Sequence, residues 1–209
     1  IFRRNPIEAI KTLKTIFDQF REELFTDNKL EELFLECELK VRDNNLPEKL
    51  KEHYLQLMDA IKIFPLYQYW KVRENRIDYG DMILNLWKLL ENSKPTKDVL
   101  QKRYKHIIVD EFQDNNYALN EISRLISKKN RSITVVGDDD QVIYSFRGAN
   151  AFNISTFEKT YESHPNYEMI TLETNYRSSQ PILDLANNSI KHNKERLSLI
   201  HISEPTRPY

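Results

Sequence analysis

Acidic side chains directly follow two short apolar segments of this chain. The first segment, 107–109, leads into Asp110, Glu111 and Asp114, and the second, 133–136, leads through Gly137 into Asp138, Asp139 and Asp140. A single acidic strand end is readily explained as a solvated turn. Two such ends in one chain indicate a functional site, because charge beside buried apolar residues is costly unless it is solvated or paired.

The pair Asp110–Glu111 suits metal-assisted phosphate chemistry. Mg²⁺ prefers hard oxygen ligands, usually one or two carboxylates together with waters and substrate phosphates. A neighbouring carboxylate can then orient or deprotonate an attacking water. The structural alternative is that Asp110, Glu111 and Asp114 only end a strand and cap the next helix, and the run 138–140 alone is a weaker indication.

The segment VVGDDDQVIYSFRGA carries side chains that suit phosphate and base recognition. Gln141 offers both a donor and an acceptor to a terminal phosphate. Tyr144, Phe146 and Arg147 form an aromatic–aromatic–cation set that suits stacking on unpaired bases. Each of these residues also has an ordinary packing explanation, above all Phe146 as a core residue.

A third candidate group lies in the segment LETNYRSS. Arg177 is a permanent cation, and Tyr176 is its neighbour. Contacts from arginine to phosphate and from an aromatic ring to a base are natural roles for this pair. The alternative for Arg177 is a surface salt bridge.

Alternating strands and helices are predicted to position these residues. Apolar strands are expected at 106–109, 132–136 and 169–172, with helical patterns between them and a further helix that opens near Pro181. Such alternation indicates an α/β fold with a parallel sheet covered by helices. Ligands of these sheets collect at the carboxyl ends of the strands, where the acidic clusters lie.

The N-terminal part of the chain has helical periodicity alone. Asn5 and Pro6 are expected to open the first helix, and Asp78 is expected to cap the fourth. Pro47 starts the third helix, which Pro65 is predicted to break or kink. The apolar stripes of these helices are explained by core packing, and they run through 10–24, 30–41, 50–61 and 83–90.

The composition of the chain excludes several classes of protein. Its 209 residues carry 31 basic and 32 acidic side chains, so any nucleic-acid binding must rest on a local patch and on stacking. Cys37 is the only cysteine, which excludes an internal disulfide and a cysteine-rich metal site. No apolar run approaches the roughly 18 residues of a membrane span, and no signal-peptide pattern opens the chain. We therefore expect a cytoplasmic protein.

Three strings resemble the UvrD/Rep/PcrA branch of the superfamily 1 DNA helicases. They are IIVDEFQDNN, VVGDDDQVIYSFRGA and LETNYRSSQPIL, and in this order and spacing they look like motifs II, III and IV of that family. The stretch RIDYGDMI also looks like the short segment that precedes motif II. The resemblance is detailed over 76–196, and over 1–75 it is only consistent with a helical insertion.

The resemblance implies a role for each matching residue. Asp110 would hold Mg²⁺, and Glu111 would be the base for the hydrolytic water. Gln141 would contact the γ-phosphate of ATP, Tyr176 would stack on adenine, and Arg177 would be an arginine finger. Single-stranded DNA would lie on Tyr144, Phe146 and Arg147. Phe146 stands where many relatives carry Trp, Val142 replaces a frequent Ser, and Thr174 replaces a frequent Gln.

The resemblance also implies a RecA-like helicase core of the P-loop type that is incomplete within this chain. No G-x-x-x-x-G-K-[ST] string occurs, and the chain holds only Gly80, Gly137 and Gly148. The phosphate cradle is expected upstream of Ile1, and the last motifs are expected beyond the C-terminus, so we expect a fragment.

The expected domains are a partial helical insertion subdomain (1–75), a RecA-like ATPase core (76–166) and the start of a second RecA-like domain (167–197). The remaining string SLIHISEPTRPY, 198–209, resembles a translation of sequencing-adapter DNA and is expected to pack on nothing.

The function expected from the resemblance is that of an ATP-dependent DNA helicase, with ATP and Mg²⁺ as cofactors. It would move 3′ to 5′ on single-stranded DNA and unwind junctions of single- and double-stranded DNA. A relative with the same motor fused to a nuclease is one alternative. A Mg²⁺-dependent nuclease that uses Asp110, Glu111 and 138–140 is another, although it leaves Gln141, Tyr176 and Arg177 unexplained. A non-catalytic DNA-binding module would bind DNA with no nucleotide linkage.

Overall fold

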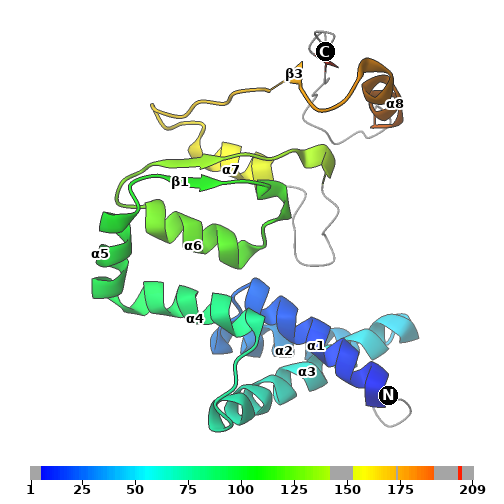
Figure 1. Ribbon diagram of the computed structural model, residues 1–209. Coiled ribbons are helices and arrows are strands. Elements are labelled where there is room, and N and C mark those ends of the chain that lie inside the picture. Colours follow the sequence, from blue (N-terminus) through cyan, green and yellow to red (C-terminus); the bar gives the residue numbers. More distant parts are fainter. Residues whose placement is uncertain (1–5, 142–152, 173, 191–201, 204–209) are drawn as a thin grey trace. The chain divides into compact units, whose positions relative to one another are not determined.

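The computed structural model describes residues 6–141, 153–172, 174–190 and 202–203 (Figure 1). The chain forms two compact units. The first comprises Ile1–Val109, Asn115–Thr134 and Phe146–Gly148, and the second comprises Asp110–Asp114, Val135–Ser145 and Ala149–Tyr209. The described residues are mostly helical and include a small parallel sheet. The expected boundary at residue 75 falls inside the first unit.

The first unit begins with five helices, of which the sequence predicted four. They are α1 (Pro6–Glu22), α2 (Asp27–Val41), α3 (Glu48–Arg73), α4 (Tyr79–Asn92) and α5 (Lys94–Arg103). Pro6 is the first residue of α1, and Asp78 caps α4 through a capping box with Asp81, both as predicted. The helix α5 was not predicted; Ser93 caps it by accepting a hydrogen bond from the Thr96 N–H.

The helix α3 is 26 residues long and contains Pro65 in its interior, so the helix is not broken at that residue. Pro65 lies on the exposed side of α3, while Ile61 and Phe64 on the other side are buried. Packing of that apolar side stabilises the helix more than one missing backbone hydrogen bond destabilises it.

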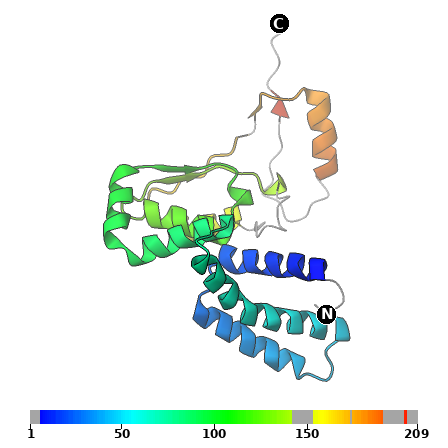
Figure 2. The same cartoon turned by 60° about the horizontal axis from the view of Figure 1, so that its bottom comes forward.

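Apolar side chains from α1, α2 and α3 form the largest core of the first unit. Phe17, Phe20 and Phe64 lie at its centre, with the Phe17 and Phe64 ring centroids 5.1 Å apart. Figure 2 shows α1, α2 and α3 packed together. A second cluster joins α4 to α6 (Tyr117–Ser127) through Leu90, Ile122 and Leu125. The predicted core stripes are therefore confirmed as packing surfaces over most of their length, while Ile10 and Leu50 at their ends are exposed.

The strands β1 (Ile107–Val109) and β2 (Ile133–Val135) form a two-stranded sheet. The Ile107 N–H donates to the Ser132 carbonyl at 3.1 Å, and the Phe112 N–H donates to the Val136 carbonyl at 2.9 Å. Residue numbers thus rise together along both strands, which makes the pair parallel, as predicted. Helix α6 packs against β1.

The second unit contains η1 (Phe112–Asp114), η2 (Asp139–Gln141), α7 (Asn153–Tyr161), β3 (Thr174–Asn175) and α8 (Gln180–Ile190). The prediction of a third strand at 169–172 is wrong. These residues pair with no strand in the described part of the chain, and Ile170 and Leu172 are exposed. Apolar composition alone does not make a strand, because a strand needs a hydrogen-bonded neighbour.

The residues Ile202–Ser203 form the short strand β4, which pairs in parallel with Thr174–Asn175. The expectation that 198–209 packs on nothing is therefore wrong for these two residues. None of the described helices is long and apolar enough to cross a membrane.

Candidate active site

A sharp turn at Asp110 and Glu111 follows β1. Asp110 Oδ1 accepts a hydrogen bond from the Glu111 N–H at 3.0 Å, and the Glu111 carbonyl accepts one from the Asp114 N–H at 2.9 Å. Glu111 has a φ of 50°, in the left-handed region that few residues other than glycine adopt. Such backbone strain persists only where surrounding contacts over-determine it, and it is concentrated at functional sites.

The residue Phe112 anchors this turn to the interior of the second unit. Its side chain is buried, and its ring packs edge-to-face on Phe157 of α7 at 5.5 Å between centroids. Asn153, which is also buried, donates from its side chain to the Phe112 carbonyl at 3.3 Å. The strained Glu111 is thus held from its C-terminal side by a rigid neighbour.

The Gln113 side chain connects the first acidic turn to the second. Its Nε2 donates to Glu111 Oε2 at 2.8 Å, and its Oε1 accepts from the Asp138 N–H at 3.1 Å. The Gln113 residue is only 2% exposed. A buried amide that both donates and accepts has one orientation in which both bonds form, so it sets the direction of the Glu111 carboxylate.

Asp138 organises the second acidic turn. Its Oδ1 accepts from the Asp140 N–H at 3.0 Å, and its Oδ2 accepts from Gln141 Nε2 at 2.8 Å. The Asp138 carbonyl accepts from the Gln141 N–H at 3.1 Å. The predicted phosphate sensor Gln141 is therefore fixed to Asp138 through both its backbone and its side chain.

Gly137 lets the two turns approach each other. A Cβ atom at this position would lie 2.6 Å from Gln113 Oε1 and 3.3 Å from the Gln113 backbone nitrogen. The first of these distances is shorter than van der Waals contact, so a larger residue would displace the bridging amide. The lack of a Cβ atom at Gly137 therefore permits this close approach.

The donor chemistry of the first turn fits a magnesium ion. The Asp110 carboxylate is exposed and makes one hydrogen bond with the neighbouring Glu111 N–H, and a solvent-facing carboxylate suits a Mg²⁺ that also binds waters and phosphates. Asp114 Oδ1 is buried and has no hydrogen-bond partner among the described residues. Among all residues that the structure describes, no group of three or more His, Cys, Asp and Glu side chains is arranged to hold a metal by itself.

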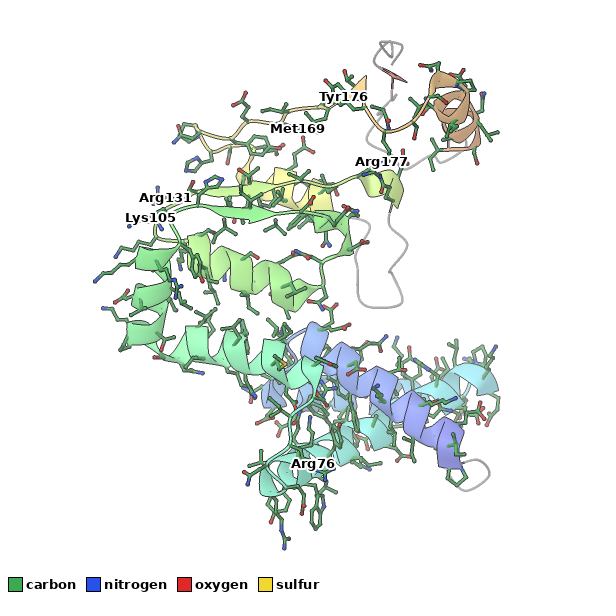
Figure 3. The ribbon with its side chains drawn as sticks, in the orientation of Figure 1. Arg76, Lys105, Arg131, Met169, Tyr176 and Arg177 are labelled. Carbon is green, nitrogen blue, oxygen red and sulfur yellow. The ribbon has the colours of Figure 1, made fainter. Side chains whose placement is uncertain are left out.

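Tyr176 and Arg177 lie on the segment between β3 and α8 (Figure 3). Both are exposed, Tyr176 by 79%. Asn175 Oδ1 accepts from the N–H groups of Arg177 and Ser178 at 2.9 and 2.8 Å, which shapes the turn. The two side chains border an open hollow of about 430 Å³. No hydrogen bond or ion pair joins the Arg177 side chain to Glu111 or Gln141 within the described residues.

Three of the sequence-predicted site residues lie together in the structure. Asp110, Glu111 and Gln141 belong to one hydrogen-bonded group, while Tyr144, Phe146 and Arg147 lie outside the described residues. Sequence reasoning missed Gln113 as a site residue. The only available signal was its place inside the string DEFQD, between two acidic residues that were already candidates.

The site belongs to a segment with known relatives. The family model of the UvrD/REP helicase N-terminal domain matches residues 4–162, so the chain belongs to the UvrD/REP helicase family. The resemblance drawn from the three motifs is confirmed.

Curated relatives in this family are named as ATP-dependent DNA helicases. The chain is 37% identical over 158 residues to the ATP-dependent DNA helicase PcrA of Leuconostoc citreum, which covers 76% of this chain and 19% of that protein. It is 40% identical over 138 residues to the ATP-dependent DNA helicase Rep of Buchnera aphidicola, and this match covers 66% of this chain and 21% of that protein. DNA helicase II of Haemophilus influenzae is 38% identical to this chain over 142 residues, and this match covers 68% of this chain and 19% of that protein. The chain thus spans about a fifth of the length of these relatives.

Proposed function

We propose that the chain is part of an ATP-dependent DNA helicase that moves 3′ to 5′ on single-stranded DNA and unwinds junctions with duplex DNA in the cytoplasm. The observation that carries the proposal is the hydrogen-bonded connection between Glu111 and Gln141 through Gln113 and Asp138. It joins a general-base candidate to a phosphate-sensing candidate. The family match and the relatives named as ATP-dependent DNA helicases support the same function.

In this proposal the chain supplies half of an ATPase site. Residues 76–166 belong to a RecA-like domain and residues 167–197 begin a second one, while 1–75 form a helical insertion. Asp110 would hold Mg²⁺, which offsets the charge of the phosphates when it is bound. Tyr176 would stack on adenine, and Arg177 would approach the γ-phosphate as an arginine finger. Single-stranded DNA would lie on Tyr144, Phe146 and Arg147.

Hydrolysis would depend on the orientation of Glu111. Its carboxylate accepts a hydrogen bond from Gln113 through one oxygen, Oε2, which leaves Oε1 for an attacking water. Gln141, held by Asp138, would contact the γ-phosphate through its amide. The water would transfer its proton to Glu111 as it attacks the γ-phosphorus, and the bond from that phosphorus to the β–γ bridging oxygen would break to release ADP. Arg177 would stabilise the charge on the equatorial oxygens.

Separate substitutions of Asp110 and Glu111 test this assignment in a full-length protein that contains the chain. Glu111→Gln removes the proton acceptor, so ATP turnover should fall by roughly 10²–10⁴ while Mg²⁺-ATP still binds. Asp110→Asn weakens the metal site, so its activity should partly recover at high Mg²⁺. The measurement is ATPase rate against Mg²⁺ concentration for each variant.

A nucleotide-free assay distinguishes the nuclease alternative. If the acidic turns bind metal for DNA cleavage, the unsubstituted protein cleaves DNA with Mg²⁺ alone and both variants lose that activity. The helicase proposal expects no cleavage under these conditions. Wild-type ATP turnover by Glu111→Gln would show that Glu111 is not the base.

A further inference from the structure

Three hydrogen bonds form a continuous path between Glu111 and Gln141. Gln113 Nε2 donates to Glu111 Oε2, the Asp138 N–H donates to Gln113 Oε1, and Gln141 Nε2 donates to Asp138 Oδ2. The distances are 2.8, 3.1 and 2.8 Å, all within the range of good hydrogen bonds. Every residue in the path belongs to the second compact unit.

Gln113 is the central residue of the path and the only one that is fully buried. It is 2% exposed, while Glu111 and Gln141 are exposed. A buried polar side chain is costly unless its bonds are made, and here both ends of the amide are used. A side chain that served packing alone would be better replaced by an apolar residue of the same size.

The chemistry of the amide matches the demands of the two turns. One turn presents a carboxylate that accepts, and the other presents a backbone N–H that donates. Glutamine donates and accepts at once without carrying charge and without depending on a protonation state. Gly137 reinforces the match, because a Cβ there would lie 2.6 Å from Gln113 Oε1.

We propose that Gln113 is a positioning residue that links the state of Gln141 to the orientation of Glu111. A phosphate that draws Gln141 toward itself moves Asp138, which shifts the Gln113 amide and turns the Glu111 carboxylate. The Glu111 carboxylate is exposed and accepts this hydrogen bond from the buried Gln113 amide, so a shift of the amide changes the direction of the carboxylate. The inference rests on the proposed ATPase function, and it adds the residue that couples phosphate sensing to the base.

Two substitutions of Gln113 test its two hydrogen bonds in a full-length protein that contains the chain. Gln113→Met keeps the volume and removes both the donor and the acceptor. Gln113→Asn keeps an uncharged amide on a side chain one methylene shorter, so it cannot hold both bonds at once, and it keeps a polar group at this place if the methionine variant folds poorly. Both variants should lower DNA-stimulated kcat by about 10- to 100-fold, the range expected when a catalytic group is misplaced. The KM for ATP and the Kd for single-stranded DNA should change little.

Gln101→Met is the matched control. Gln101 is a second buried glutamine, at 6% exposure, and its Nε2 donates to the Leu125 carbonyl at 2.7 Å in the first unit. This substitution should lower the melting temperature as Gln113→Met does and leave kcat unchanged. If Gln113→Met lowers only the melting temperature, or if Gln113→Asn keeps the wild-type kcat, the linking role is refuted.

A double-mutant cycle with Glu111→Gln completes the test. If Gln113 acts through Glu111, adding Gln113→Met to Glu111→Gln should change kcat by less than about twofold, because the group it positions is already lost. If the effects of Gln113→Met and Glu111→Gln on kcat multiply in the double variant, Gln113 does not act through Glu111, and the assignment of Glu111 as the base is unaffected. Full activity of Glu111→Gln alone would instead refute the proposed ATPase assignment, so the two failures are distinguishable.

Discussion

Arg21 Nη1 lies 2.8 Å from Asp78 Oδ2, although the two residues are 57 positions apart in the chain. Arg21 is on α1, and its side chain is 2% exposed; Asp78 caps α4. Lys71 on α3 donates to Asp78 at 3.0 Å and to Asp81 Oδ1 at 2.7 Å. A largely buried ionic cluster thus joins α1 and α3 to the start of α4.

Removing Arg21 should destabilise the first unit strongly. Arg21→Met leaves Asp78 and Asp81 without one of their cations in a mostly buried place, and breaking such a pair costs about 3–5 kcal/mol. The ion pair Arg42–Glu38 is a matched control at 2.9 Å with exposed side chains. Arg42→Met should cost less than about 0.5 kcal/mol. Urea unfolding of the two variants measures both values, and equal losses would show that the Arg21 cluster contributes no more than a surface pair.

Stability should also fall in acid because of Asp78. Burial alone would raise the pKa of Asp78, but the hydrogen bonds from Lys71 and from the Asp81 N–H, with the charge of Arg21 and the hydrogen bond from Tyr67, lower the pKa from 3.8 to about 2. A lowered pKa in the folded state means that the stabilisation is complete above pH 3.8 and is lost as the pH falls toward about 2.

The expected loss is about 1–2 kcal/mol, since one pKa unit corresponds to about 1.4 kcal/mol and part of the group is exposed to solvent. The free energy of unfolding measured between about pH 5 and pH 2 checks this, with Asp78→Asn as the reference. The difference between the two proteins should shrink over that interval. A difference that stays constant would mean that Asp78 does not titrate as expected.

The 209 residues by themselves should have no ATPase activity typical of a motor. The chain contains no glycine-rich phosphate loop, which in P-loop enzymes supplies the backbone cradle, the lysine and the metal-binding hydroxyl. The measurement is ATP hydrolysis with and without single-stranded DNA. DNA-stimulated turnover by this chain alone would contradict the proposal that it holds only part of the site.

Tyr144 and Phe146 should contribute to single-stranded DNA binding in a full-length protein that contains the chain. Tyr144→Ala and Phe146→Ala should each weaken binding by about 1–3 kcal/mol, the usual contribution of a base stacked on an aromatic ring. The affinity for ATP without DNA should change little. Binding titrations with a fluorescent oligonucleotide measure the effect, and normal binding by an unstable variant would identify the rings as core residues.

Local features of the structure could be predicted from the sequence because they depend on neighbouring residues. Pro6 opens a helix, since its missing N–H costs nothing there, and Asp78 caps another through its own side chain. The acidic turn at Asp110 and Glu111 was identified from the apolar run before it. The motif strings also identified the family, because they occur in a recognisable order and spacing.

Other features depend on contacts between distant parts of the chain, which only the tertiary structure decided. The 169–172 segment has strand composition but no strand to pair with among the described residues, and α3 passes Pro65 because its other side is buried. The role of Gln113 depends on Asp138, 25 positions away, whose N–H donates to the amide, and Gly137 leaves room for the amide oxygen where the two turns meet. Hydrogen bonds between distant residues follow from chain packing, so composition and spacing determined which chemistry was available, and the packing decided which groups act together.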